Sequence, residues 1–188
     1  MLSLEARMHK LALNQEGSVL YPMDQLKRDL VLINTATGAI IKTLPAVVDK
    51  LILGEIRTDP FSGALYICDA KGLKVKRSDA GGAAPQTTYT FPAGSEPIDI
   101  AFSAQYHFIA AGKSLYKYDA ATGSPIASTA FATACKSVTV APTGDVLFVT
   151  LATSMAILDA RSLSLLSEVP LASSGIESVV VNPVKFTL

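Results

Sequence analysis

Three acidic residues, Glu55, Asp99 and Glu177, each lie close to the start of a short apolar segment and are the best candidates for chemistry. Carboxylates in such places can hold a metal ion or act as general acid and base in hydrolysis. Asp99 is the most notable, because Ile98 and Ile100 flank it and an unpaired carboxylate among apolar neighbours is costly. The interpretation we favour is that all three are solvated charges, on loops or along a wet channel.

No other arrangement in the sequence favours catalysis or metal binding. His9 and His107, the two histidines, are not near a cysteine or aspartate at the spacing of a zinc site. Ser173-Ser174-Gly175 has no adjacent base, and Gly81-Gly82 lacks the lysine and helix of a phosphate-binding loop. We therefore predict a protein without catalytic residues, without a metal and without a cofactor.

A unit of about 40 residues is repeated along the chain. One apolar segment per unit ends on an Asn or Asp, and these residues are Asn34, Asp79, Asp119 and Asp159, at intervals of 45, 40 and 40 residues. An earlier apolar segment of each unit contains an aliphatic landmark, at Leu20, Leu65, Ile109, Leu147 and Leu188. Asn and Asp favour tight turns because their side chains accept hydrogen bonds from the backbone. We expect the four Asn and Asp residues to occupy equivalent turns between third and fourth strands.

Four short strands per period of about 40 residues predict an all-β fold of the β-propeller type. Residues 1–8 form a lead-in and 9–188 the repeats, with four-stranded blades at about 9–46, 51–93, 97–132 and 136–171 and the start of a fifth at 177–188. So few blades leave the two ends of the array open. Either the remaining blades of a longer propeller or a second copy must cover those ends. We favour a longer propeller, because Leu188 falls inside an apolar strand.

The composition limits the function classes. Of 188 residues, 49% are hydrophobic and 17% charged, which requires a large buried interior. The 16 basic and 16 acidic residues cancel, which argues against direct nucleic-acid binding. Apolar runs are too short to cross a membrane, and the mixed-charge N-terminus is unlike a secretory signal. With Cys68 and Cys135 expected as separate buried thiols, these features point to the cytoplasm or nucleus.

One loop carries the densest mixture of charges in the chain. It contains Asp24, Lys27, Arg28 and Asp29, and it joins the second and third strands of the first unit. Most charged loops are simply solvated, but loops on rigid scaffolds are also where proteins bind partners. We take this loop as the candidate interaction surface.

The third unit carries a family resemblance. Its segment Leu115-Tyr116-Lys117-Tyr118-Asp119-Ala120-Ala121-Thr122-Gly123 resembles the end of a WD40 repeat, and Ile100–Ser103 with Ile109–Gly112 resemble the first two strands. The chain has no tryptophan, so Ile33, Tyr118 or Leu158 stands where WD40 repeats have Trp, and the family's His–Ser–Trp hydrogen-bond network cannot form. Propellers of the YVTN and quinoprotein-like group share the Asp-x-x-Thr-Gly turn, lack the Trp, and resemble the chain nearly as well.

The WD40 resemblance implies a non-enzymatic scaffold for protein–protein interaction. Tandem propellers of ribosome-assembly particles have similarly degenerate repeats, so a subunit of such a particle is one expectation. The alternative is a propeller enzyme or small-molecule-binding propeller, lactonase-like or quinoprotein-like, in which Glu55, Asp99 and Glu177 would face the channel. Fold alone does not decide between these classes.

Overall fold

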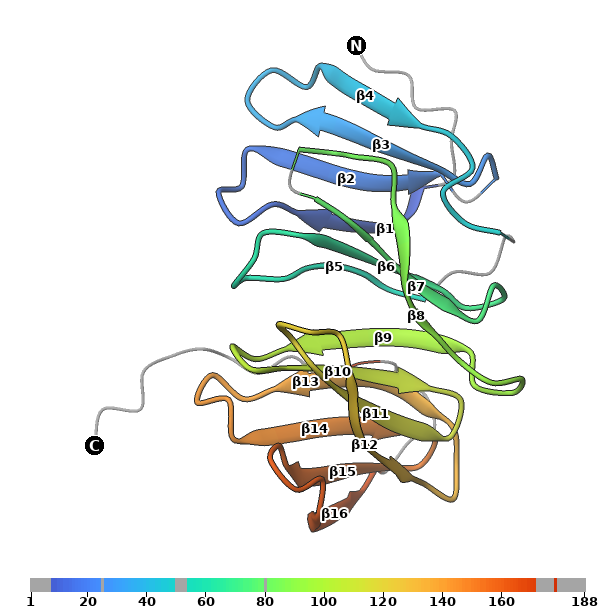
Figure 1. The fold of residues 1–188 in the computed structure, drawn as a ribbon, viewed down its shortest axis with the longest axis vertical. Helices are drawn as coiled ribbons and strands as arrows, with labels where there is room; N and C mark the ends of the chain where they lie inside the picture. The colour runs from blue at the N-terminus through green and yellow to red at the C-terminus, as the bar shows by residue number, and fades with distance from the viewer. Residues whose placement is uncertain (1–7, 25, 50–53, 80, 172–177, 179–188) are drawn as a thin grey trace. The chain divides into compact units, whose positions relative to one another are not determined.

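The computed structural model describes residues 8–24, 26–49, 54–79, 81–171 and 178. Within these ranges the chain is all-β: sixteen strands form four antiparallel sheets of four strands each. Each sheet is a meander in which consecutive strands are neighbours (Figure 1). The prediction of an all-β, propeller-type fold built from four-stranded blades is confirmed. The expected fifth blade, 177–188, lies outside the described residues except for Ser178.

The strands of each blade follow one another along the chain. Blade 1 contains β1 (Met8–Leu13), β2 (Val19–Asp24), β3 (Asp29–Asn34) and β4 (Ile40–Leu44). Blade 2 contains β5 (Ile56–Thr58), β6 (Leu65–Asp69), β7 (Lys74–Ser78) and β8 (Gln86–Thr90). Blade 3 contains β9 (Pro97–Phe102), β10 (Tyr106–Ala111), β11 (Ser114–Asp119) and β12 (Pro125–Ala130). Blade 4 contains β13 (Cys135–Val140), β14 (Val146–Leu151), β15 (Ser154–Asp159) and β16 (Leu165–Pro170).

The chain divides into two compact units, Met1–Ile100 and Ala101–Leu188, and the division falls within β9. The first unit holds blades 1 and 2 together with the start of β9. The second holds the rest of blade 3 and blade 4. Each unit is described by itself below.

Strand register defines equivalent positions in the four blades. Asn34, Asp119 and Asp159 pair with Val19, Tyr106 and Val146 across the second and third strands. Asp79 follows Ser78, which pairs with Leu65, and so takes the same place in blade 2.

Blade 3 has a shorter first hairpin than the other blades. The amide of Ser103 donates to the carbonyl of Tyr106, three residues on, whereas Asn14 donates to Val19, five residues on. His107 is therefore the residue equivalent to Leu20, Leu65 and Leu147. The predicted landmark of this blade, Ile109, lies two residues further on. His107 is buried and packs edge-on against Phe102 at a ring distance of 5.3 Å.

An aromatic residue follows that position in every blade. The four residues are Tyr21, Tyr66, Phe108 and Phe148. The first three are buried and Phe148 is half-buried. Because successive side chains of a strand point to opposite faces of the sheet, these aromatics mark one face of each blade. We call it the downstream face, since in the first unit it packs against the next blade along the chain.

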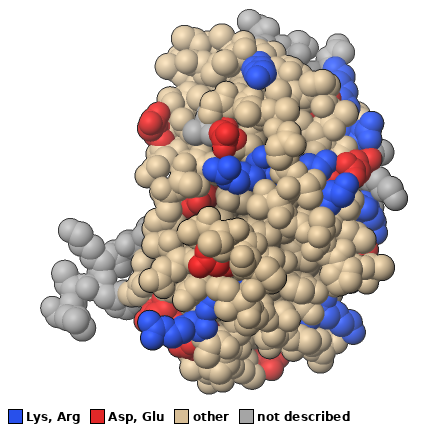
Figure 2. Space-filling model, viewed as in Figure 1, with Lys and Arg blue, Asp and Glu red and all other residues tan. Residues whose placement is uncertain are grey.

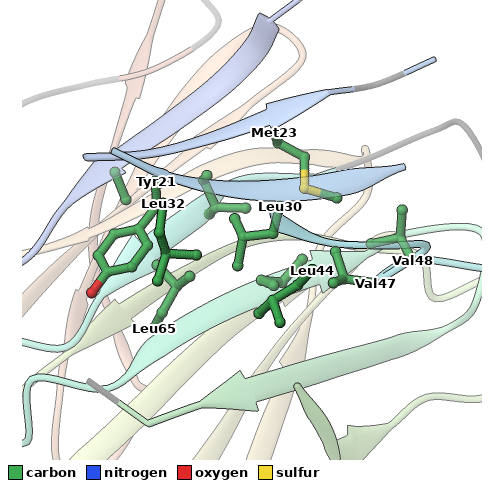
Figure 3. Packing of buried hydrophobic residues seen from close by; sticks show 11 residues of the cluster. Tyr21, Met23, Leu30, Leu32, Leu44, Val47, Val48 and Leu65 are labelled. Atoms are coloured by element: carbon green, nitrogen blue, oxygen red, sulfur yellow. The ribbon is translucent and has the colours of Figure 1, made fainter. Parts of the chain in front are cut away.

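The core of the first unit lies between blades 1 and 2 (Figure 3). The downstream face of blade 1 consists of Tyr21, Met23, Leu30, Leu32 and Leu44, and it packs in one buried cluster with Ile56, Leu65 and Ile67 of blade 2. Those three residues lie on the opposite, or upstream, face of their blade. Full burial of each such aliphatic side chain contributes about 1.5 to 3 kcal/mol, so this contact supplies much of the stability of the unit.

The turns after the third strands share one geometry in blades 1, 3 and 4. The side-chain Oδ1 of Asn34, Asp119 or Asp159 accepts a bond from the backbone amide three residues on, at 2.9, 2.8 and 2.7 Å. The next residue has positive φ, which suits Gly38 and Gly123, and in blade 4 Leu163 adopts it at φ 60°. In blade 2 the Asp79 carboxylate forms an ion pair with Arg77 at 3.0 Å.

Candidate functional site

The most deeply buried candidate, Asp99, forms a bidentate ion pair. Arg57 Nε donates to Oδ1 of Asp99 at 2.9 Å and Nη2 donates to Oδ2 at 3.2 Å. The amide of Ile100 also donates to Oδ1, at 2.9 Å. Asp99 is fully buried, whereas the Arg57 side chain is partly exposed. Fork-shaped pairing of this kind satisfies both carboxylate oxygens and holds β5 to β9 within the first unit.

Glu55, the second candidate, is also paired with a cation. It immediately precedes β5, and its Oε1 accepts a hydrogen bond from Lys10 Nζ on β1. Its backbone amide donates to the carbonyl of Ile98 at 2.7 Å. At Gly54, an added Cβ would lie 2.5 Å from the Ile98 oxygen, so this close backbone approach requires glycine.

The structure thus places Glu55 and Asp99 on neighbouring first strands, but each holds its own cation. Neither Lys10 nor Arg57 was singled out in the sequence, because both partners are more than 40 residues away along the chain. Glu177, the third candidate, lies outside the described residues.

The predicted interaction loop is mostly held by its own side chains. Asp24 is buried, and its Oδ1 accepts bonds from the amides of Leu26 and Lys27 at 3.0 and 3.1 Å. Arg28, at φ 64°, donates to the carbonyl of Asp49 at 2.8 Å. Asp29 accepts a bond from an amide in the segment after β4. Leu26 and Lys27 remain exposed at the tip.

A charged cluster that the sequence did not reveal adjoins this loop. Lys76 Nζ donates to Oδ1 of Asp49 at 2.8 Å and to the carbonyl of Val47 at 2.9 Å, and lies 3.2 Å from Oδ2 of the fully buried Asp69. Lys74 Nζ reaches the other carboxylate oxygen of Asp49 at 2.9 Å. Hydrogen bonds from Lys76 and Lys74 lower the pKa of Asp49 to about 2.

The depressed pKa of Asp49 predicts an acid-dependent loss of stability. The ionised Asp49 carboxylate contributes fully to the free energy of unfolding above its usual pKa of 3.8. This contribution disappears as the pH falls towards about 2, where the carboxylate of the folded protein becomes protonated. Because Asp49 is exposed to solvent, we expect less than about 1 kcal/mol. Urea unfolding of the wild type and of Asp49→Asn between pH 5 and pH 2 measures this contribution. The difference between their free energies of unfolding should shrink as the pH falls. A constant difference would contradict the assignment.

Lys117 is the buried cation of the second unit. Its Nζ lies 3.7 Å from the centre of the Tyr106 ring and donates to the carbonyl of Arg161 in blade 4. Burial lowers the pKa of this ammonium group. The side chain therefore joins blades 3 and 4 by a cation–π contact and a hydrogen bond.

The two cysteines are buried and free. Burial raises the pKa of the Cys68 thiol well above its usual value and that of Cys135 to about 12. Both therefore stay protonated at neutral pH, whereas a nucleophilic cysteine needs a stabilised thiolate.

Charges on one face of the molecule occur as small mixed groups among uncharged residues (Figure 2). In the described part of the chain, no three His, Cys, Asp or Glu side chains gather as they would around a metal ion. Those same ranges contain no helix with the length and hydropathy that a membrane crossing needs.

Comparison with known proteins supports the fold. No protein-family model matches the sequence, and no curated protein matches it. The solved structure of Kuenenia stuttgartiensis hydrazine synthase is similar, with a TM-score of 0.74 and 15% identity over 87% of this chain and 49% of that one. The mitotic checkpoint complex contains a similar chain, with a TM-score of 0.74 and 15% identity over 91% of this chain and 54% of that one.

A third similar structure is the dihydro-heme d1 dehydrogenase NirN in complex with DHE. Its TM-score is 0.71 at 16% identity, covering 88% of this chain and 38% of that one. At such identities the likeness establishes the propeller-type fold alone. The chain spans about half the length, or less, of these structures.

Proposed function

We propose that this chain is a non-enzymatic scaffold of WD40-like type that binds other proteins in the cytoplasm or nucleus. The observation that carries the proposal is the pairing of its best catalytic candidates. Asp99 is bound by Arg57 and Glu55 by Lys10, so both carboxylates hold neighbouring first strands together. A carboxylate fixed in a bidentate ion pair is poorly suited to take up or release a proton in a reaction.

The similarity to a chain of the mitotic checkpoint complex supports a role within a larger assembly. A ribosome-assembly particle is one such setting, suggested by the degenerate repeats. The enzymes among the similar structures support the competing proposal of a small-molecule-binding propeller.

The contact surface we propose is the tip of the β2–β3 loop. Asp24 accepts a hydrogen bond from the amide of Leu26, and Arg28 is anchored to the carbonyl of Asp49. Leu26 and Lys27 project from this support, and both are exposed. Residues whose backbone is already hydrogen-bonded lose less conformational entropy on binding, and here they present an apolar side chain beside a charge.

Affinity purification from the source cells tests this proposal with two matched variants. Leu26→Ser with Lys27→Glu should lower recovery of the specific partners about tenfold or more, as loss of an anchor residue does, without changing the melting temperature. Phe61→Ser changes an equally exposed apolar residue in the β5–β6 turn and should have no effect.

Two results would contradict the scaffold. One is unchanged partner recovery with the loop variant. The other is a small molecule that co-purifies with the wild type in native mass spectrometry and is lost from folded Asp99→Asn, which would favour the enzyme or ligand-binding alternative.

A further inference from the structure

The loop between the second and third strands has the same construction in blades 1 and 2. It spans residues 24–29 in blade 1 and 69–74 in blade 2, and its first and last residues pair with each other. In both loops the carboxylate of the first residue, an aspartate, accepts a hydrogen bond at 3.1 Å from the amide three residues on. The next residue has positive φ, 64° at Arg28 and 54° at Leu73. The blade 2 loop is therefore an internal template for the blade 1 loop.

The two loops differ in the side chains at their tips. Blade 1 has Leu26 and Lys27 there, and blade 2 has Lys71 and Gly72 at the same places. An added Cβ at Gly72 would lie 2.5 Å from the carboxylate that caps the loop, so blade 2 has no side chain in the place of Lys27. Lys71 forms an ion pair with Glu96 at 3.3 Å. The template thus shows the cation at the tip of this loop matched by a carboxylate.

Lys27 has no such match in its own unit. It is exposed, and among the lysines of the described ranges it is the one whose ammonium group makes no hydrogen bond or ion pair with another described residue. The connection between blades 1 and 2, residues 45–55, contains two acids, Asp49 and Glu55. Both already bind other lysines. The two acids of the loop itself accept bonds from backbone amides. Neither the loop nor this connection therefore supplies a carboxylate to Lys27.

We propose that the β2–β3 loop binds a segment of a partner protein in which an Asp or Glu side chain lies beside an apolar one. The partner's carboxylate pairs with Lys27 as Glu96 pairs with Lys71 in blade 2. Its apolar side chain packs on Leu26, which is 62% exposed. Complementary charge of this kind selects the partner and fixes its register. The inference rests on the proposed function, because it names the chemistry of the partner that the scaffold binds at this loop.

A phage-displayed library of random linear peptides, selected on the immobilised chain, tests the chemistry of the partner. We expect the enriched peptides to share an acidic residue next to an apolar one. A synthetic peptide of that sequence should bind Lys27→Glu about tenfold more weakly than the wild type, because repulsion replaces an exposed ion pair. Added salt should weaken its binding to the wild type. Replacing the acidic residue of the peptide with lysine should restore binding to Lys27→Glu.

Lys113→Glu is the matched control, since it places the same substitution at an exposed lysine in the β10–β11 turn of blade 3. It should bind the peptide like the wild type, and circular dichroism checks that both variants are folded. Enriched peptides without an acidic residue, an equal loss with Lys113→Glu, or a lysine-substituted peptide that does not recover binding to Lys27→Glu would each overturn the inference.

Affinity purification with single variants separates this inference from the scaffold proposal. We expect Leu26→Ser and Lys27→Met each to lower recovery of the partners. If Leu26→Ser lowers recovery while Lys27→Met leaves it unchanged, the scaffold stands and the acidic partner is wrong. If neither variant lowers recovery, the scaffold proposal itself fails. Recovery that is lost after phosphatase treatment of the lysate would show that a phosphate, and not a carboxylate, pairs with Lys27.

Discussion

Replacing Arg57 with alanine should lower the free energy of unfolding by about 3 kcal/mol. The substitution leaves Asp99 buried without its cation, and loss of one partner of a buried ion pair costs about 3 to 5 kcal/mol. We take the lower end because the Arg57 side chain is partly exposed. Urea unfolding at neutral pH measures the effect.

Lys10→Ala is the matched control for this prediction. It breaks the neighbouring ion pair with Glu55, in which both side chains are partly exposed, and should cost less than about 1 kcal/mol. Equal losses for Arg57→Ala and Lys10→Ala would show that burial of Asp99 does not set the energy of its pair.

Phe108→Ala should be as damaging, at about 3 to 5 kcal/mol, because it removes a fully buried aromatic side chain and leaves a cavity. The equivalent change in blade 4, Phe148→Ala, should cost about 1 to 2 kcal/mol, since Phe148 is only half-buried. Thermal or urea unfolding of both variants at a concentration where the chain is monomeric gives the comparison. Equal losses would show that the difference in burial between Phe108 and Phe148 does not set their contributions to stability.

The repeat could be predicted from the sequence because it depends on local signals. Apolar segments separated by Asn, Asp and Gly predicted strands and turns, and these follow from short-range backbone preferences. In blade 3 the predicted aliphatic landmark, Ile109, was wrong. The first hairpin of this blade is two residues shorter than the others, so the equivalent of Leu20 is His107. An aliphatic residue was expected there, so the buried histidine went unnoticed.

The candidate site could be predicted only in part. Asp99 stood out because of its apolar neighbours, but its partner Arg57 is 42 residues away, and only the folded chain brings the two side chains together. Lys76 and Asp69 likewise meet across two paired strands. The row of aromatics at Tyr21, Tyr66, Phe108 and Phe148 was present in the sequence, and alignment on the strand before the Asn or Asp turn would have revealed it.

The central claim is that Asp99 stabilises the structure while the loops bind partners. The double variant Arg57→Leu with Asp99→Leu tests it most directly, through the partners that it recovers. Replacing a buried ion pair with two apolar side chains is often neutral for stability. The account predicts a folded double variant that recovers the same proteins as the wild type in quantitative affinity purification. A double variant that folds normally but loses those partners, or loses a bound small molecule that the wild type retains, would contradict it.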